Sequence, residues 1–261
     1  MRYLRLYAHF LRFSFSRAMM FRLDFFFRFF MDLVFYAAQM AFFAALYGHT
    51  RTLGGWTWEQ ARVFVAGYFV VDALHMTVFS SNAWWFPFLV NRGDLDYYLV
   101  RPVSSLFFMT LREFAANSFL NLVVAVGILA WALCGHPEPL GAGRILLYGA
   151  LLLNGALLYG IVHWLFLVPV FWIQANRGLN DVFFGCMGFL GKPHGIFQGW
   201  TRRILLTALP YGLMASVPAA LLFEGATLGW LAHLASVTGG LFLVLVLLWR
   251  RGLRAYASAS S

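Results

Sequence analysis

Two residues capable of acid–base chemistry stand inside an apolar run of the sequence. Asp72 and His75 are three positions apart in the stretch 63–81, where most other side chains are apolar. Residues three apart share one face of a helix. Ionisable groups inside a membrane segment mark ion or proton pathways, but they also pair with one another or with a neighbouring helix. Asp72 and His75 are therefore candidate pathway residues, with a purely structural pairing as the alternative.

The sequence contains none of the nucleotide-binding, hydrolase or metal-binding motifs for which we searched. The nearest approach to a phosphate-binding loop, Gly185-Cys-Met-Gly-Phe-Leu-Gly-Lys-Pro193, has one residue too many and a proline where Mg²⁺ requires a hydroxyl. No His-Glu-x-x-His or Gly-x-Ser-x-Gly is found. Cys134 and Cys186 lack a second cysteine or histidine at metal-ligand spacing. We expect no catalytic, metal or cofactor site.

Residues 91–104 concentrate charge in a chain that otherwise avoids it. The charged side chains are Arg92, Asp94, Asp96 and Arg101. They alternate with an apolar stripe at helical spacing, formed by Leu95, Tyr98 and Leu99. The pattern predicts a short amphipathic helix, opened by Gly93 and Asp94 and ended by Pro102. Such a helix suits a groove of another protein, although a solvated connector between two membrane helices has the same composition.

The overall composition indicates a membrane protein. Of 261 residues, 62% are hydrophobic and only 11% are charged, and the mean hydropathy is +0.74. Soluble domains keep about a quarter of their residues charged. The formal net charge of +9 lies beside apolar runs, where anionic lipid explains it. We therefore expect an all-α, polytopic membrane protein that contacts lipid and does not bind nucleic acid.

Five apolar runs are long enough to cross about 30 Å of hydrocarbon. They cover residues 29–47, 63–81, 114–134, 145–173 and 228–249. A sixth crossing within 180–223 keeps the arginines of both termini on the cytoplasmic side. The count of charges favours 204–223 for this crossing, whereas Pro210 and Pro218 make that segment a poor simple helix and favour 179–191.

Residues 1–28 are predicted to form an interfacial amphipathic helix. A polar stripe contains Arg2, Arg5, His9, Arg12 and Ser16, and the opposite face contains Leu4, Tyr7, Phe10 and Leu11. A basic face opposite an apolar face is typical of a helix that lies on anionic lipid headgroups. A contact with a cytosolic partner is an open alternative to simple anchoring.

Three blocks of sequence carry a resemblance to a known family. The first is Gly93-Asp-Leu-Asp-Tyr-Tyr-Leu-Val-Arg-Pro-Val-Ser104. The second comprises Lys192-Pro193, Ile196-Phe197, Arg203-Ile-Leu-Leu-Thr-Ala-Leu-Pro210 and Val217-Pro-Ala219, and the third is Leu248-Trp-Arg-Arg-Gly-Leu-Arg-Ala-Tyr256. In this order, and over nearly the whole chain, they resemble ABC-2-type export permeases, the membrane subunits of ATP-binding cassette transporters. Tyr97 and Tyr98 depart from the small or branched residues more usual in that family.

The resemblance implies a permease that pairs with a second permease chain and docks two copies of a separate cytosolic ATPase, which would bind ATP and Mg²⁺. Residues 93–102 would then be the coupling helix. The residues expected at the ATPase contact are Arg92, Gly93, Asp94, Leu95, Asp96, Tyr98, Leu99, Arg101 and Pro102. The charges would orient the contact, and Leu95 and Leu99 would fill a groove of the ATPase.

The family also carries an outer re-entrant hairpin before its last span. This implies a fifth span at 179–191 and a hairpin at 193–223, against the count of charges. We expect one permease domain over 1–261, with six spans and both termini in the cytoplasm of a bacterial inner membrane. Two other functions stay open: an ion- or proton-coupled secondary transporter that uses Asp72 and His75, and a non-transporting membrane scaffold.

Overall fold

Helices make up almost all of the regular structure. The computed structural model describes residues 2–18, 22–173 and 178–256. Over these residues its regular structure consists of helices and one isolated β-bridge between Leu53 and Trp56. The predicted all-α class is confirmed.

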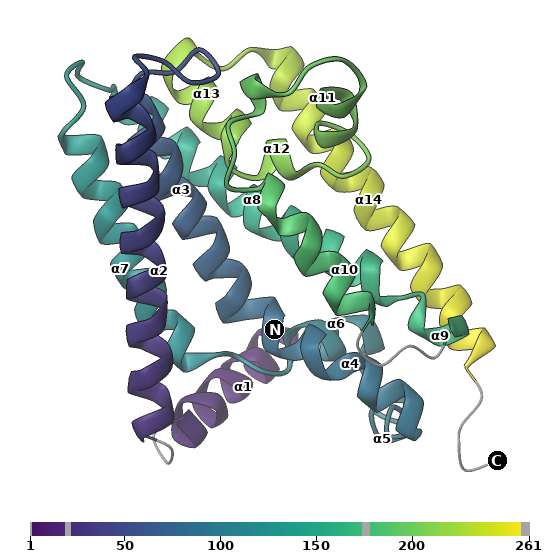
Figure 1. The fold of residues 1–261 in the computed structure, drawn as a ribbon. Helices are drawn as coiled ribbons and strands as arrows, with labels where there is room; N and C mark the ends of the chain where they lie inside the picture. Colours follow the sequence, from purple (N-terminus) through teal and green to yellow (C-terminus); the bar gives the residue numbers. More distant parts are fainter. Residues whose placement is uncertain (1, 19–21, 174–177, 257–261) are drawn as a thin grey trace.

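The elements follow one another along the chain as Figure 1 shows. They are α1 (Arg2–Ala18), α2 (Arg22–His49), α3 (Trp58–His75), the π-helix η1 (Met76–Ser80), α4 (Ser81–Arg92), α5 (Asp96–Leu99), α6 (Ser105–Leu111), α7 (Ala116–Cys134), α8 (Ala142–Leu167), α9 (Val170–Ile173), α10 (Gly178–Cys186), the 3₁₀ turns η2 (Met187–Phe189) and η3 (His194–Ile196), α11 (Gly199–Leu205), α12 (Tyr211–Met214), α13 (Ser216–Glu224) and α14 (Leu228–Ala255).

Five helical stretches are long and apolar enough to cross a membrane, and they match the five predicted runs. They are Phe29–His49, Trp58–Arg92, Ala116–Cys134, Ala142–Ile173 and Leu228–Ala255. The second is longer than predicted, because η1 and α4 continue α3 to Arg92 without a break. α10 has nine residues, about 14 Å at 1.5 Å per residue, and is too short to span hydrocarbon by itself.

The bundle is built around α3 and α8. Side chains on every face of α3 are buried, and Phe64 and Val71 are fully so. Tyr159 and Trp164 of α8 are also buried. α2 lies beside α3 and α7 in Figure 1 and contacts both, yet it leaves many large apolar side chains exposed, Phe42 among them. A hydrophobic exposed face of this kind suits lipid or another protein chain.

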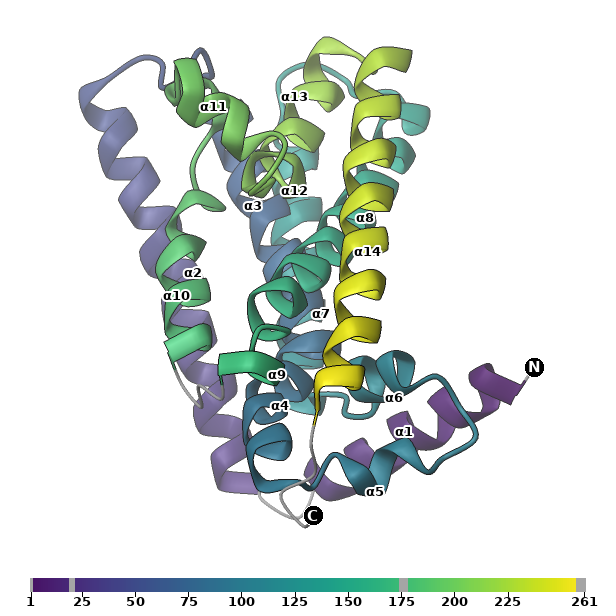
Figure 2. The same ribbon diagram turned by 90° about the vertical axis from the view of Figure 1, so that its right-hand side faces the viewer.

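The remaining short helices gather at two ends of the bundle. α1, α5 and α6 lie at one end, where α14 also finishes, and we call this the elbow end (Figure 2). α11 lies at the opposite end, where the loops that join α2 to α3 and α7 to α8 also lie, and we call this the far end (Figure 1). α10 and η2 carry the chain from the elbow end towards the far end (Figures 1 and 2).

The predicted interfacial helix over 1–28 is shorter in the structure. α1 ends at Ala18 and α2 begins at Arg22, while residues 19–21 lie outside the described residues. α1 runs crosswise beneath the long helices (Figure 2). The predicted polar stripe is exposed at Arg5, His9, Arg12 and Ser16, while the opposite face packs through Phe10 against Phe108 of α6. α1 therefore lies across the bundle axis (Figure 2), and its Phe10 contact places part of its apolar face against α6.

Residues 193–223 form short helices instead of one continuous helix. Pro210 directly precedes α12, and the helical path breaks again at Ala215 before α13 begins. α12 is buried against α8, where Gly155 allows close approach. A Cβ atom at Gly155 would lie 1.9 Å from the carbonyl oxygen of Met214. This part of the chain is therefore packed backbone to backbone into the core.

Candidate functional site

The elbow, residues 91–104, begins with a turn that favours glycine. α4 ends at Arg92, and Gly93 adopts a φ of 79°, in the left-handed region. The amide of Gly93 donates to the carbonyl of Val90 at 3.2 Å and closes α4. Helix α5 then covers only Asp96–Leu99. Gly93 therefore ends the preceding helix instead of opening the predicted one, and the elbow helix is shorter than predicted.

One face of the elbow is packed into the chain's own core. Leu95 is 0% exposed and belongs to a buried cluster that includes Phe86 and Phe108. Tyr98 and Leu99 are half-buried against the same cluster. The contact role predicted for Leu95 is therefore corrected, because a side chain that its own bundle already covers cannot fill a groove of a partner.

The opposite face of the elbow is open. Tyr97 is 73% exposed and Val100 is 83% exposed. Arg92, Arg101 and Pro102 are exposed beside them, and Asp94 and Asp96 are half-buried. The apolar stripe of a surface helix faces its own core, so a partner meets the other side. That rule identifies Tyr97 and Val100, which the prediction from sequence omitted.

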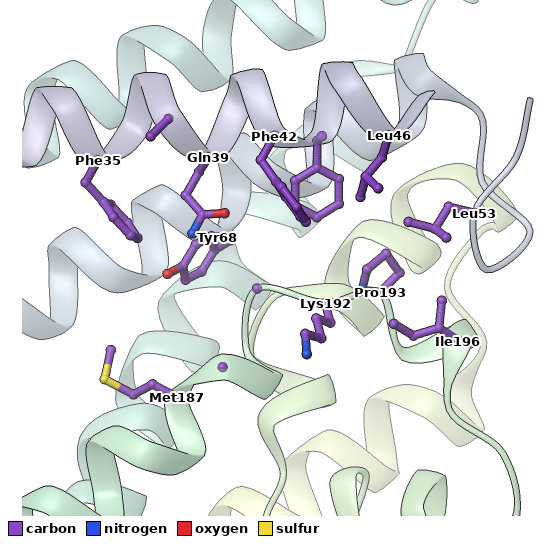
Figure 3. A pocket seen from close by; sticks show the side chains of 14 residues that line it. Phe35, Gln39, Phe42, Leu46, Leu53, Tyr68, Met187, Lys192, Pro193 and Ile196 are labelled. Carbon is purple, nitrogen blue, oxygen red and sulfur yellow. The ribbon is translucent and has the colours of Figure 1, made fainter. Parts of the chain in front are cut away.

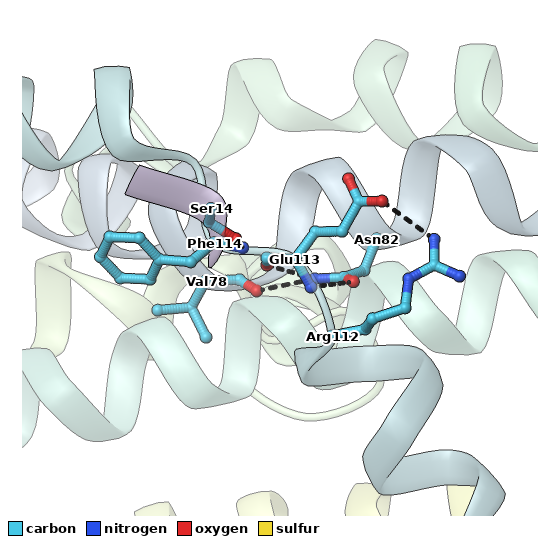
Figure 4. Close-up of polar contacts among 6 residues, drawn as sticks. All are labelled: Ser14, Val78, Asn82, Arg112, Glu113 and Phe114. Carbon is cyan, nitrogen blue, oxygen red and sulfur yellow. Dashed lines mark hydrogen bonds and ion pairs between the residues drawn. The ribbon is translucent and has the colours of Figure 1, made fainter. Parts of the chain in front are cut away.

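Asn82, in the first turn of α4, fixes the segment between α6 and α7 (Figure 4). Its side-chain amide donates to the carbonyl oxygens of Glu113 at 2.7 Å and Val78 at 3.1 Å, and its Oδ1 accepts the amide of Glu113 at 2.8 Å. Asn82 is 2% exposed. Its two bonds satisfy both backbone polar groups of Glu113, which lies outside the helices. The start of α4 is thus joined to the approach to α7.

Neighbouring amides of the same segment bond to two further elements. The amide of Phe114 donates to Oγ of Ser14 in α1 at 3.1 Å (Figure 4). The amide of Ala115 donates to the carbonyl of Thr77 at 2.9 Å. Thr77 belongs to the π-helix η1, a kind of helix turn that is rare and recurs at functional sites. α1, η1, α4 and α7 therefore meet at one hydrogen-bonded junction.

Two arginines connect the elbow with this junction. The guanidinium of Arg112 pairs with the carboxylate of Glu113 at 3.0 Å (Figure 4) and lies 4.8 Å from the ring centre of Tyr98. Arg101 lies 5.1 Å from the ring centre of Phe108. A cation over an aromatic ring contributes about 0.5–2 kcal/mol. These contacts tie α5 to α6 and to the segment that Asn82 holds.

The C-terminal end of α14 completes the site. Trp249 donates its indole N–H to Oγ of Ser105 at 3.0 Å. Burial, and then the negative charges of Asp96 and Asp94, raise the pKa of the Tyr256 hydroxyl above its ordinary value. Both carboxylates of the elbow therefore lie close enough to the last described residue to act on its ionisation.

Asp72 and His75 do not form a pair with each other. Nε2 of His75 lies 3.1 Å from Nδ1 of His163, and Nε2 of His163 lies 3.1 Å from Oδ1 of Asn180. His75 also stacks on Tyr159, with ring centres 3.9 Å apart. Asp72 instead lines a small cavity with residues of α2 and α7. The structure thus separates the two candidate pathway residues, and His163 and Asn180 are too distant in sequence for any spacing rule to have joined them to His75.

A cavity of about 660 Å³ opens between α2, α3 and residues 187–196 (Figure 3). Phe35, Phe42 and Leu46 extend into it from α2. Lys192, the chain's only lysine, is the one cation in its lining. A cavity of this size with mostly apolar walls suits hydrocarbon, with an anionic group placed beside the lysine. Among the residues that the structure describes, no three His, Cys, Asp or Glu side chains cluster where they could hold a metal ion.

A comparison with protein families identifies the kind of membrane protein to which this chain belongs. The family described as ABC-2 family transporter protein matches residues 33–260, which is most of the chain. The chain belongs to the ABC-2 transporter family. Neither a curated protein nor a solved structure matches it.

As an ABC-2 permease, the chain is the membrane component of an ATP-binding cassette transporter and has no catalytic ATPase domain of its own. The resemblance read from the three sequence blocks is confirmed. A transporter of this type needs a separate ATPase, so the permease must offer that protein a contact surface. In the described part of this ABC-2 permease, the elbow combines exposed apolar side chains with both signs of charge.

Proposed function

We propose that this ABC-2 permease exports its substrate across a bacterial inner membrane, with two copies of a cytosolic ATPase docked on the face of the transporter that carries the elbow. ATP and Mg²⁺ bind to the ATPase, and this chain binds neither. A second permease chain completes the translocation pathway. The motion of the ATPases on nucleotide binding reaches the membrane helices through the elbow.

The observation that carries the proposal is the two-sided construction of the elbow. Leu95 anchors one side in the core, while Tyr97 and Val100 project from the other. An interface needs apolar or aromatic anchors surrounded by charges that set orientation. Arg92 and Arg101 supply such charges at the exposed rim. In this proposal, Tyr97 and Val100 take over the anchor role first assigned to Leu95 and Leu99.

The contacts around the elbow provide a route for force. Tyr98 packs against Phe108 with ring centres 5.6 Å apart, and Arg112 lies over Tyr98. Arg112 pairs with Glu113, which Asn82 holds by two hydrogen bonds. A displacement of α5 would therefore act on the start of α4 and of α7 together, because these contacts connect α5 to both.

We further propose six crossings, with α10 and η2 as the fifth and α11 to α13 as a hairpin that enters from the outer side. The helical segment of α10 and η2 is about 20 Å long, so it would complete a crossing only together with the loops at its ends. The buried packing of α12 against α8 supports a segment that enters the bundle and returns. This topology leaves the elbow and both termini in the cytoplasm.

A pair of matched aromatic variants tests the docking surface. Tyr97 at the elbow and Trp200 at the far end are 73% and 75% exposed. With the cognate ATPase, Tyr97→Ala should weaken binding to detergent-solubilised permease about tenfold and lower permease-stimulated ATP hydrolysis. Trp200→Ala should leave both unchanged. Equal effects of the two substitutions, or no effect of Tyr97→Ala, would reject the elbow as the docking surface.

Labelling of single cysteines tests the sidedness. With Cys134 and Cys186 replaced by serine, a membrane-impermeant maleimide should label Trp200→Cys in intact spheroplasts. It should label Tyr97→Cys only after permeabilisation. The reverse pattern would place the elbow outside, where no cytosolic ATPase could reach it.

Transport driven by a proton gradient without any ATPase would support the secondary-transporter alternative, and the absence of any transport would support the scaffold.

A further inference from the structure

The polar side chains of three membrane helices meet in a small cavity that the proposed function does not use. Asp32 of α2, Asp72 of α3, and Ser118 and Asn121 of α7 line it. The rest of its wall is apolar or aromatic and includes Tyr36. Its volume is about 20 Å³, enough for one body the size of a water molecule. No residue in this lining carries a positive charge.

Two oxygen atoms at this cavity lack a hydrogen-bond partner. Oδ1 of Asp72 and Oδ1 of Asn121 are both buried and unpartnered, and the two residues are 8% and 2% exposed. Both atoms accept hydrogen bonds and cannot donate them when the carboxyl group is ionised. An acceptor that is buried in hydrocarbon without a partner is costly, so such groups are expected to meet a donor or a cation.

The orientation of Asn121 is already fixed by its other end. Its Nδ2 donates to a carboxylate oxygen of Asp32, which leaves Oδ1 directed away from that bond. The side chain thus binds one carboxylate through its amide, while its remaining oxygen is buried without a partner and the residue lines the same cavity as Asp72. The group presents oxygen ligands from α3 and α7, with Asp32 of α2 at its edge.

We propose that this cavity binds one Na⁺ ion. Oδ1 of Asp72 and Oδ1 of Asn121 are the central ligands, and the hydroxyl of Ser118 and the carboxylate of Asp32 complete the site. Oxygen ligands suit hard cations. Mg²⁺ keeps several bound waters and Ca²⁺ takes six to eight ligands. Neither therefore fits a cavity that has room for one water-sized ion or molecule. A dehydrated monovalent ion fits, and Na⁺ is the smaller of the two abundant ones.

The site would have a structural consequence for α2. This helix exposes much of its apolar surface, and Tyr36 and Phe43 are its buried side chains in the described part. An ion bound by residues of α2, α3 and α7 would add polar contacts between α2 and its neighbours. Binding of Na⁺ should therefore stabilise the folded permease by mass action.

Thermal unfolding of the purified chain in detergent tests the proposal. At constant ionic strength, replacing N-methylglucamine by 100 mM Na⁺ should raise the apparent Tm by about 5 °C. K⁺ should have a smaller effect. Asp72→Asn should abolish the Na⁺-specific rise, whereas Asp181→Asn, the same change at an exposed position of α10, should retain it. A rise that K⁺ reproduces in full, or that Asp72→Asn retains, overturns the assignment.

Direct binding measurements keep the test decisive if Asp72→Asn folds poorly. Radioactive ²²Na⁺ should bind to the wild-type chain at about one ion per chain, and Ser118→Ala should weaken that binding several-fold. A hydrophobic carbodiimide, which reacts with protonated buried carboxyl groups, should modify Asp72 more slowly when Na⁺ is present. Absence of ²²Na⁺ binding, or modification that Na⁺ does not slow, would show that a proton or a water molecule occupies the cavity instead, and would overturn the proposal.

Discussion

The chain leaves its long helices and folds back at both ends of the bundle, but the two ends are held by different interactions. At the elbow end, side chains bond to backbone groups: Asn82 holds Glu113, and Ser14 holds Phe114. At the far end, the backbone of α12 lies directly on α8 at Gly155. Side-chain hydrogen bonds fix a segment and leave the surface beside it free, whereas direct backbone packing leaves no space between the elements.

The exposure of the two ends follows from this difference. The elbow presents Tyr97 and Val100 to its surroundings, while all four residues of α12 are buried. A segment whose tip is open and whose base is fixed is suited to receive a partner. A segment whose centre is buried is suited to close the bundle. Substitutions that act on one kind of attachment should therefore leave the other intact.

The largest effect is expected at the far end, from Gly155→Leu. Any side chain at Gly155 would collide with the carbonyl of Met214, and α12 would have to leave its position on α8. We expect a loss of about 3 kcal/mol in the free energy of unfolding, with poor yield of folded protein. Gel-filtration profiles and thermal melts in detergent measure both.

The matched control is Gly149→Leu on the same helix, where a new Cβ would meet no atom within 4 Å. This variant should elute and melt as the wild type does. If the two variants behaved alike, the close packing of α12 on α8 would not be the feature that holds the far end.

The next largest effect is expected at the elbow end, from Asn82→Ala. The substitution removes the two hydrogen bonds between Asn82 and the backbone of Glu113, and we expect a loss of about 2 kcal/mol. ATP hydrolysis by the docked ATPase should also respond less to the permease, because the link from α5 to α7 is cut. Asn154→Ala, which loses one side-chain bond to Thr238, should cost less stability and leave this response unchanged. A reversed order of the two would remove the special role of the junction.

The sequence predicted what depends on local patterns and missed what depends on distant contacts. Apolar runs gave the five long helices, and clustered charge gave the position of the elbow. The predicted contact of Leu95 with the ATPase was wrong, because an apolar stripe shows that a face is buried. It does not show whether the chain's own core or a partner covers that face. The bonds from Asn82 to Glu113 and from His75 to His163 join residues 31 and 88 positions apart, and no spacing rule reaches that far.

A smaller effect is expected at the start of the elbow, from Gly93→Ala. The left-handed φ of 79° strains any residue with a Cβ, and we expect a loss of about 1 kcal/mol. Because the turn itself is kept, ATPase binding should fall only slightly. Gly93→Asn, which tolerates this conformation better, should lie between alanine and the wild type in thermal melts. Equal stability of the alanine variant and the wild type would mean that the turn can change its path without loss.

The smallest effect is a loss of stability at low pH, which we expect at the far end and not at the elbow end. At the far end, the amide of His194 donates to Oγ of Ser216 at 2.8 Å, and Nδ1 lies 2.7 Å from the same oxygen. The direction of the contact between Nδ1 and this oxygen depends on the tautomer of the neutral ring, whereas a protonated ring can only donate. Burial, and then the charge of Arg202, lower the pKa of His194 from 6.5 to about 4.

Between pH 6.5 and pH 4 the unfolded chain therefore binds more protons than the folded one, so stability falls as the pH falls through this window and is constant above it. The loss between pH 6.5 and 5.5 should stay below about 1 kcal/mol, because the ring is partly open to solvent. His194→Asn should flatten the dependence in thermal melts, whereas His49→Asn, at an exposed position of the same end, should not. Hydrogen exchange, corrected for its intrinsic pH dependence, should accelerate over 193–216 and stay unchanged over 82–115. Equal acceleration at the elbow junction would mean that acid loosens the bundle as a whole, and the distinction between the two attachments would not hold for this titration.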